Sequence, residues 1–214
     1  MEIPLLSLLV YLPIAMCGKS INSAHAAESP IYTVIHSESD FQIRLYNESS
    51  WMSSLVVGGT SFKEATRSGF HRLYQYIHGA NFNSSKLEIT APVLTSIALS
   101  PRGNNYTVKL YISNEYQGRP PQPNPELMLQ LAKLGTQCIA VRKFSGFAKD
   151  DNVSKEAEAL LGSLNKQLTG NSSTIDKSSY TIAQYNAPST SSGRLNEVWI
   201  KMSGLTVEGC PPSQ

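Results

Sequence analysis

The sequence predicts a single α+β domain, in which antiparallel strands are combined with two helices. Segments with alternating apolar and polar residues, typical of half-buried strands, occupy much of the chain. Two longer segments repeat their apolar residues at helical spacing instead. A strand–helix–strand–strand order occurs twice, without visible sequence identity between the halves. Antiparallel strands followed by a packed helix are the pattern of an α+β domain.

The first half contains four extended segments and one helix. The expected strands cover residues 32–46, 51–57, 87–99 and 106–112. The helix is expected to begin at an N-cap formed by Thr60 or Ser61, with Glu64 in its first turn. It is expected to run to about His78 and to end at Gly79, which suits a left-handed C-cap.

The second half repeats this order after a Pro-rich loop at residues 118–125. Residues 127–131 are interpreted as either a short strand or a turn of helix. The expected strands of this half cover residues 138–144, 180–185 and 197–202. The second helix is expected over residues 150–168, with Asp150 as its N-cap. Its apolar face is formed by Ala157, Leu160, Leu161 and Leu164.

Composition limits the classes of function. The 214 residues suffice for one domain with a real core, and 41% hydrophobic with 16% charged residues is typical of globular proteins. A formal net charge of +2 is too small to favour nucleic acid or an anionic membrane as a partner. The sequence has no nucleophile–base pair, no CxxC or HExxH metal spacing and no phosphate loop. It therefore predicts a protein that is not an enzyme.

Residues 1–26 are interpreted as a secretory signal peptide. Their apolar run, residues 3–16, is shorter than the roughly 20 residues that span a bilayer. Small residues at Ala24 and Ala26 fit cleavage before Ala27. The segment has Glu2 and no Lys or Arg at its start, so a membrane-retained anchor is the alternative. The remaining chain is expected to be a domain over residues 27–205 and a flexible tail over residues 206–214.

Two further features favour export to the extracellular space or the endomembrane lumen. Five Asn-x-Ser/Thr sequons indicate a glycosylated surface: Asn47, Asn83, Asn105, Asn152 and Asn171. Cys17 leaves with the signal peptide, and Cys138 and Cys210 remain as a possible disulfide, the alternative being two unpaired thiols. No second apolar run of spanning length follows, so the mature chain is not expected to insert stably into a membrane.

Seven short stretches, in this order and at these intervals, resemble the SOUL heme-binding protein family over roughly residues 30–202. They are FQIRLY (41–46), YIHGAN (76–81), ITAPV (89–93), GRPPQP (118–123), VRKFSGF (141–147), YNAP (185–188) and NEVWI (196–200). The resemblance implies a distorted antiparallel β-barrel flanked by two long helices and built from two pseudo-symmetric β-α-β-β halves.

The resemblance also implies reversible, non-catalytic binding of heme or another tetrapyrrole. The implied site is a shallow apolar groove between the first helix and the loop before the last strand. Alignment on YIHGAN places Arg67, Phe70 and Tyr74 on its helix side. The loop side is formed by Tyr185, Pro188 and Arg194.

Helical geometry independently places the same helix residues together. At 100° per residue, Phe70, Tyr74 and Arg67 follow one another along one flank, together with His78 and His71. Such a flank offers aromatic surface to a macrocycle and a guanidinium to a propionate. A solvated helix surface with the same residues is the alternative interpretation.

Two departures from the family pattern concern the ligand. Phe70 and Tyr74 stand where the best-described relatives have methionine. Leu45 stands where one branch of the family has a proposed iron-ligating histidine, and leucine cannot ligate iron. His71 and His78 are the remaining imidazoles on the flank. These departures favour the rival hypothesis, a protein-interaction or small-amphiphile-binding module that keeps the fold without heme; the sequence identifies no protein partner.

Near the end of the chain, two residues are interpreted as structural. Trp199 is expected to anchor the core, and Glu197 to pair with either Arg194 or Arg44.

Overall fold

The computed structural model describes residues 27–57, 61–167, 175–202 and 209–211. Within these residues, nine strands form one antiparallel sheet in the order β1-β2-β7-β9-β8-β4-β5-β3-β6. The strands are β1 Tyr32–Ser37, β2 Gln42–Tyr46, β3 Ser49–Val56, β4 Val93–Ala98, β5 Asn105–Tyr111, β6 Leu129–Leu134, β7 Gln137–Ser145, β8 Ser179–Gln184 and β9 Leu195–Met202. The helices are α1 Phe62–Ile77 and α2 Asp150–Gln167, with two 3₁₀ turns, η1 Asn114–Tyr116 and η2 Pro125–Leu127.

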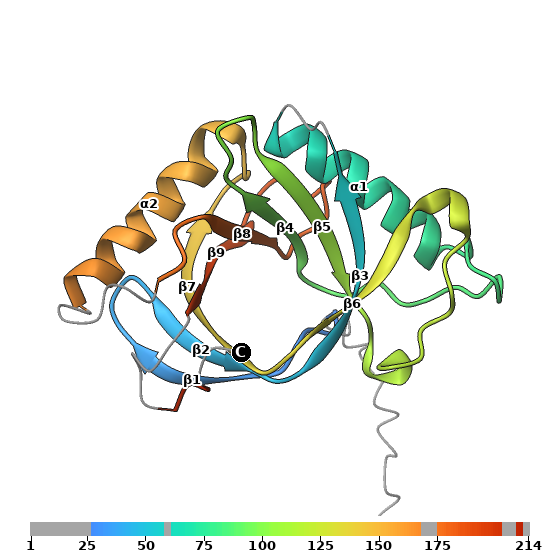
Figure 1. The fold of residues 1–214 in the computed structure, drawn as a ribbon, viewed down its shortest axis with the longest axis horizontal. Helices are drawn as coiled ribbons and strands as arrows, with labels where there is room; N and C mark the ends of the chain where they lie inside the picture. The colour runs from blue at the N-terminus through green and yellow to red at the C-terminus, as the bar shows by residue number, and fades with distance from the viewer. Residues whose placement is uncertain (1–26, 58–60, 168–174, 203–208, 212–214) are drawn as a thin grey trace, which may run out of the picture.

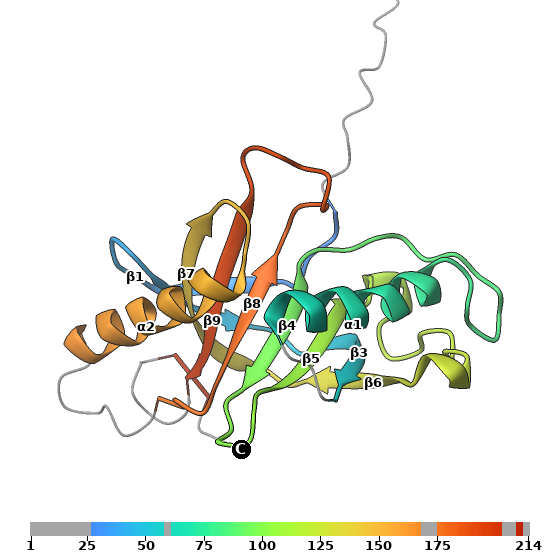
Figure 2. The ribbon, with the colours of Figure 1, turned by 90° about the horizontal axis from the view of Figure 1, so that it is seen from above.

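The sheet curls into a half-barrel, and both helices lie on its outer face (Figure 1). Helix α1 packs over β3, β4 and β5, and α2 packs over β7 and β9. Figure 2 shows the two helices on the same side of the sheet, one for each half of the chain. The expected α+β fold, a curled antiparallel sheet with two helices on its outside, is confirmed.

Strand alternation divides the core into two clusters, one on each face of the sheet. On β9, Val198 and Ile200 point outward into the cluster beneath the helices. The next residue along, Trp199, points inward and joins the cluster on the concave face. Because successive strand residues point to opposite faces, the position of a residue along its strand decides which cluster it joins.

Local capping signals set the limits of α1. The Ser61 side chain is the N-cap and accepts a hydrogen bond from the Glu64 amide at 3.2 Å. The helix ends at Ile77 with His78 as C-cap, and Gly79 follows with φ +107°. A φ in this range favours glycine, which explains why the helix stops at this point.

Asp150 does not cap its own helix, which corrects the sequence expectation. It is the first residue of α2, and its carboxylate accepts hydrogen bonds from the amides of Phe62 at 2.5 Å and Lys63 at 3.3 Å. These amides belong to the first turn of α1, which has no helical partners for them. One carboxylate therefore stands at the N-terminal ends of both helices, where negative charge is stabilising.

Three extended segments differ from the sequence expectation. Residues 32–46 form two strands rather than one, because the chain turns back where the Glu38 amide donates to the Phe41 carbonyl at 2.9 Å. In residues 87–99 the strand begins only at Val93, after a cis peptide bond between Ala91 and Pro92. Residues 127–131 contain the end of η2 and the start of β6, so both alternatives hold in part.

Cys138 on β7 and Cys210 near the C-terminus are joined by a disulfide. The bond attaches the C-terminal segment to the sheet. The predicted signal peptide and the sequon at Asn171 lie outside the described residues. No helix in the described part of the chain combines the length and apolarity needed to cross a membrane.

Candidate functional site

Three rings follow one another along an exposed flank of α1. Phe70 is half-buried, Tyr74 is 45% exposed and His78 is exposed. The ring centroids of Phe70 and Tyr74 are 6.2 Å apart, and those of Tyr74 and His78 are stacked at 3.9 Å with 27° between their planes. Residues four apart are neighbours on one face of a helix, so the three rings form a continuous aromatic ladder.

Two polar contacts show which side of α1 carries the ladder. The hydroxyl of Thr66 is 2.9 Å from that of Thr95 on β4, and Arg72 donates to the Leu55 carbonyl on β3 at 2.7 Å. Helical geometry places Tyr74 on the same side as Thr66. The ladder therefore lies on the β4 side of α1, and β8 is the next strand along (Figure 2).

The strand residues beside the ladder follow from pairing. Thr95 faces α1, so Val93, two residues earlier, faces the same way. Val93 pairs with Gln184, the last residue of β8, so Gln184 also lies on the helix side of the sheet. Sequence reasoning missed Gln184. Its position two residues after the buried Ile182 was the signal that could have identified it.

Arg67 adds a positive charge to this flank. Its side chain is exposed and has no hydrogen-bond or ion-pair partner among the described residues. His71 is also exposed, with its Nε2 3.3 Å from the Gln75 side-chain nitrogen. Helix α1 therefore brings together all five predicted helix residues of the site: Arg67, Phe70, His71, Tyr74 and His78.

The predicted loop residues are placed differently. The Tyr185 hydroxyl donates to Glu197 at 2.7 Å, so this ring lies on the concave face, with the sheet between it and α1. Arg194 is 6% exposed and donates to two carbonyls of its own loop at 2.8 and 2.9 Å. Its guanidinium also lies 4.5 Å from the centre of the Phe147 ring. Pro188 is exposed on the same loop. Arg194 thus orders the loop instead of offering a free charge.

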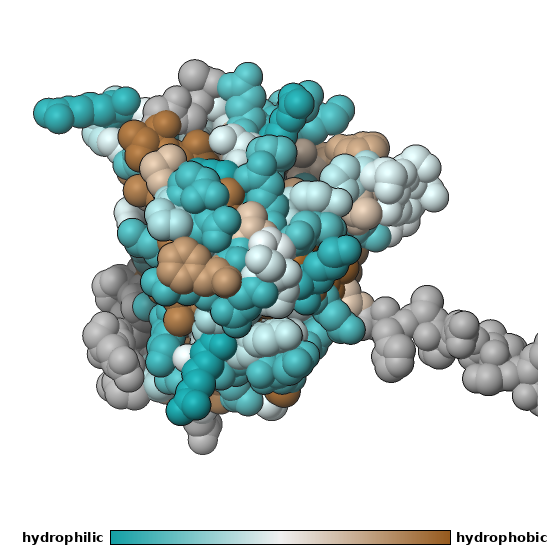
Figure 3. All heavy atoms as spheres, turned by 90° about the vertical axis from the view of Figure 1, so that its right-hand side faces the viewer, coloured by the Kyte–Doolittle hydropathy of each residue, from teal (hydrophilic) through white to brown (hydrophobic). Residues whose placement is uncertain are grey.

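Figure 3 views the molecule from the right-hand side of Figure 1, where the C-terminal half of α1 and the connections after it lie. The apolar side chains visible there form separate small patches among hydrophilic residues. A ligand on this face would therefore contact local apolar surface and keep much of its edge in water.

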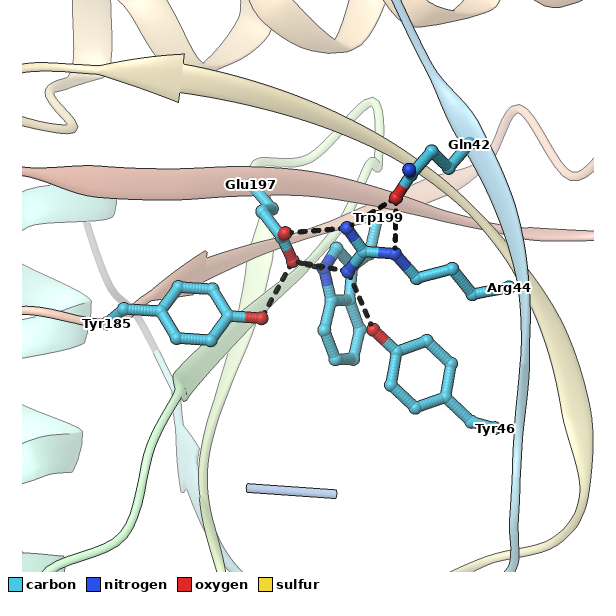
Figure 4. A network of polar contacts seen from close by, with 6 residues as sticks. All are labelled: Gln42, Arg44, Tyr46, Tyr185, Glu197 and Trp199. Carbon is cyan, nitrogen blue, oxygen red and sulfur yellow. Dashed lines mark hydrogen bonds and ion pairs between the residues drawn. The ribbon is translucent and has the colours of Figure 1, made fainter. Parts of the chain in front are cut away.

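A second polar cluster lies on the concave face of the sheet (Figure 4). Glu197 and Arg44 form a bidentate pair at 3.0 and 3.1 Å, and both residues are at most 2% exposed. Glu197 also accepts hydrogen bonds from the Tyr185 hydroxyl at 2.7 Å and the Trp199 indole at 2.8 Å. Of the two partners expected for Glu197, Arg44 is therefore the one with which it forms an ion pair.

The remaining hydrogen atoms of the Arg44 guanidinium are also used. They are donated to Gln42 at 2.9 and 3.1 Å and to the Tyr46 hydroxyl at 3.2 Å. Burial is the largest single influence on Arg44 and alone would lower its pKa, but the charge of Glu197 together with the hydrogen bonds to Tyr46 and Glu197 raises that pKa. Burial, followed by the charge of Glu197, raises the pKa of Tyr185. The arginine therefore stays charged and the tyrosine neutral, with their hydrogen bonds satisfied inside the sheet.

A hollow of about 200 Å³ opens beside this cluster. Its walls include Pro30, Tyr32, Tyr46, Lys143, Tyr185 and Glu197. Pockets for drug-sized ligands have volumes of about 300–1,000 Å³. The hollow is therefore too small for a porphyrin, although it has room for a smaller amphiphile. The described residues contain no group of three or more His, Cys, Asp or Glu side chains that could hold a metal ion.

Comparisons with known proteins agree with this architecture. Residues 27–201 match the family model of the SOUL heme-binding protein. The chain is 33% identical to human heme-binding protein 2 over 164 residues, which are 75% of this chain and 77% of that protein. It is 29% identical to heme-binding protein 1 of Xenopus laevis, over 74% of this chain and 82% of that protein.

Among solved structures, the C-terminal domain of EcmrR superimposes with a TM-score of 0.52 at 9% identity, covering 82% of this chain and 99% of that domain. This likeness concerns the fold alone. The curled sheet with its two outer helices and the family match define an α+β protein of a heme-binding class. The chain belongs to the SOUL heme-binding protein family.

Proposed function

We propose that this protein binds heme or a related tetrapyrrole reversibly, without catalysing a reaction, on the flank of α1 that carries the aromatic ladder. The observation that carries the proposal is the exposed ladder of Phe70, Tyr74 and His78 beside the exposed guanidinium of Arg67. Membership of a heme-binding family supports the ligand class. The chemistry of the residues fits that ligand, since a porphyrin has a broad apolar ring and anionic propionates.

The energetics allow binding without a deep pocket. Roughly 300 Å² of apolar contact would contribute about 7 kcal/mol before the costs of association. That amount is enough for micromolar affinity, or somewhat better when charge-assisted hydrogen bonds are added.

The residues of the flank would contact different parts of the ligand. Phe70 and Tyr74 would cover part of the ring and exclude water from it. Arg67 would donate to a propionate, and its planar guanidinium suits a bidentate contact with a carboxylate. When bound, heme would supply an iron centre that an imidazole of this flank could hold.

A heme titration of the purified mature chain, followed at the Soret band, tests the proposal. We expect a saturable shift with one heme per chain. Weak absorbance changes that do not saturate would overturn the proposal, because they would indicate nonspecific adsorption.

The hollow on the concave face favours a second candidate function, the binding of a small amphiphile. Three tyrosines and Lys143 line a space that a porphyrin cannot enter. A single-ring aromatic acid would contact the tyrosine rings and place its carboxylate near the lysine. Calorimetric titration with benzoate tests this candidate: a saturable signal in a chain that does not bind heme would replace the first proposal by the second.

We also propose that the protein is exported and glycosylated. The Cys138–Cys210 disulfide supports an oxidising compartment. The sequon residues Asn47, Asn83 and Asn105 are exposed. The test is secretion of the full chain from a eukaryotic cell, with a mobility shift after removal of N-linked sugars; retention of unmodified chain inside the cell would contradict the proposal.

The sequon at Asn152 differs from these three. Its amide nitrogen donates to the Phe147 carbonyl at 2.9 Å, and its oxygen accepts from the Lys149 amide at 2.9 Å. The side chain thus ties the segment before α2 to the first turn of the helix, and a sugar would replace one of the two hydrogens on this nitrogen and crowd its contact with Phe147. Peptide mapping of the secreted chain is expected to show less sugar at this position than at the exposed sequons.

A further inference from the structure

We infer that His78 supplies an axial ligand to the heme iron through its Nε2 atom. The inference rests on the proposed function and adds the residue that would contact the metal. It follows from the tautomer, the orientation and the accessibility of this imidazole.

The tautomer of His78 is set by a backbone carbonyl. Its Nδ1 lies 2.8 Å from the Tyr74 carbonyl oxygen, which can only accept a hydrogen bond. Nδ1 therefore carries the proton, and in the neutral imidazole Nε2 holds the free lone pair. Metal-ligating histidines characteristically donate their other ring N–H in this way, which fixes the ring and raises the basicity of the ligating nitrogen.

The same carbonyl also accepts the backbone amide of His78, at 3.1 Å. A carbonyl oxygen has two lone pairs, so it can accept both bonds. The end of α1 thus holds the backbone and the side chain of His78 against one atom of Tyr74.

The Tyr74 ring fixes the imidazole from a second direction. The two rings are stacked at 3.9 Å with 27° between them. One face of the imidazole is therefore covered, while its edge stays accessible because His78 is exposed. Nε2 has no hydrogen-bond partner among the described residues. Tyr74 belongs to the proposed porphyrin surface, so the ligating atom lies within one helical turn of that surface.

The other described histidines lack this combination. Nε2 of His71 lies 3.3 Å from the Gln75 amide nitrogen, which can only donate, so the lone pair of this imidazole is engaged. Nε2 of His36 lies 2.9 Å from a Glu38 carboxylate oxygen, on the edge strand β1. Among the described histidines, His78 thus combines an Nε2 without a hydrogen-bond partner with a ring that is held in place, and it belongs to the aromatic ladder.

The test compares His78→Ala with His36→Ala, which removes an exposed imidazole on the edge strand β1, away from α1. Both variants of the mature chain are titrated with ferric heme and, separately, with iron-free protoporphyrin IX. We expect His78→Ala to weaken ferric heme binding by about tenfold or more. Its affinity for protoporphyrin is expected to fall less than its affinity for ferric heme, because the contacts with Phe70 and Tyr74 remain while no iron bond is lost. His36→Ala is expected to leave both affinities unchanged.

Spectroscopy gives a readout independent of affinity. The electron paramagnetic resonance and Soret spectra of the ferric complex are expected to lose their histidine-ligated signature in His78→Ala, and added imidazole is expected to restore it. Identical spectra for the original chain and His78→Ala would overturn the inference while the proposed function stands. If the original chain binds neither ferric heme nor protoporphyrin, the proposed function itself fails. Circular dichroism of each variant checks that the fold is retained.

Discussion

We expect the double variant Tyr74→Ala, Arg67→Glu to bind heme about tenfold more weakly or worse. It removes an exposed aromatic ring from α1 and reverses a charge beside it. A fully covered tyrosine buries about 150–250 Å², so covering the 45% of Tyr74 that is exposed removes about 90 Å² from water. At about 25 cal/mol per Å², this area contributes about 2 kcal/mol, or roughly thirtyfold in affinity if a porphyrin covers all of it. The charge reversal adds repulsion toward a propionate.

The assay is a heme titration at the Soret band and at fixed ionic strength, because exposed charges are screened by salt. The matched control is Leu131→Ala combined with Lys133→Glu on β6. It removes a side chain that is 41% exposed and reverses one charge on the edge strand beyond β3, on the opposite side of α1 from the ladder. Unchanged binding in the α1 variant, or an equal loss in the control, would refute the assignment of the site.

Three further predictions concern the scaffold, each measured by urea unfolding. Glu197→Gln is expected to cost about 3 kcal/mol, because it leaves the buried Arg44 charge without its partner; a cost below about 1 kcal/mol would contradict this account. Gly69→Ala is expected to cost about 1–3 kcal/mol, since its Cβ would contact the β5 side chain beneath it, whereas Gly162→Ala in open space on α2 is expected to stabilise by about 0.5–1 kcal/mol; equal effects would refute the packing argument. Burial, and then a neighbouring tyrosine, raises the pKa of Tyr76 to about 12. Its contribution to stability is therefore fully present below about pH 10 and lost as the pH rises to about 12. Tyr76→Phe is therefore expected to lose less unfolding free energy between about pH 10 and about pH 12, and an identical pH dependence would count against this pKa shift of Tyr76.

The fold class and both helices could be predicted from the sequence because their signals are local. Ser61 and Gly79 mark the ends of α1 through capping chemistry, which needs no tertiary contact. Local signals do not predict the role of Asp150. An acidic residue at a helix start is typical of an N-cap, yet this carboxylate binds the first turn of the other helix, far away in the sequence.

The positions of the candidate site residues could be predicted in part. The α1 residues lie together, as helical spacing predicts, because they share one helix face, and their role in binding stays a prediction. The sequence interpretation put Tyr185 beside α1, but its ring lies on the opposite face of the sheet. The face on which a strand residue lies depends on where the strand starts and on its register with the neighbouring strands. The sequence also left two partners open for Glu197. Arg44, the partner in the structure, is 153 residues away, and only the order β2-β7-β9 brings it close.

The position of Asp150 has a mechanical consequence for a ligand on α1. The first turn of this helix is tied to a residue of the other half of the chain, while its last turn carries the proposed iron ligand. If a bound ring tilted α1, the tilt would alter the hydrogen bonds that the amides of Phe62 and Lys63 donate to Asp150. Because Asp150 is the first residue of α2, binding in one half of the chain would then be felt at the start of the other helix.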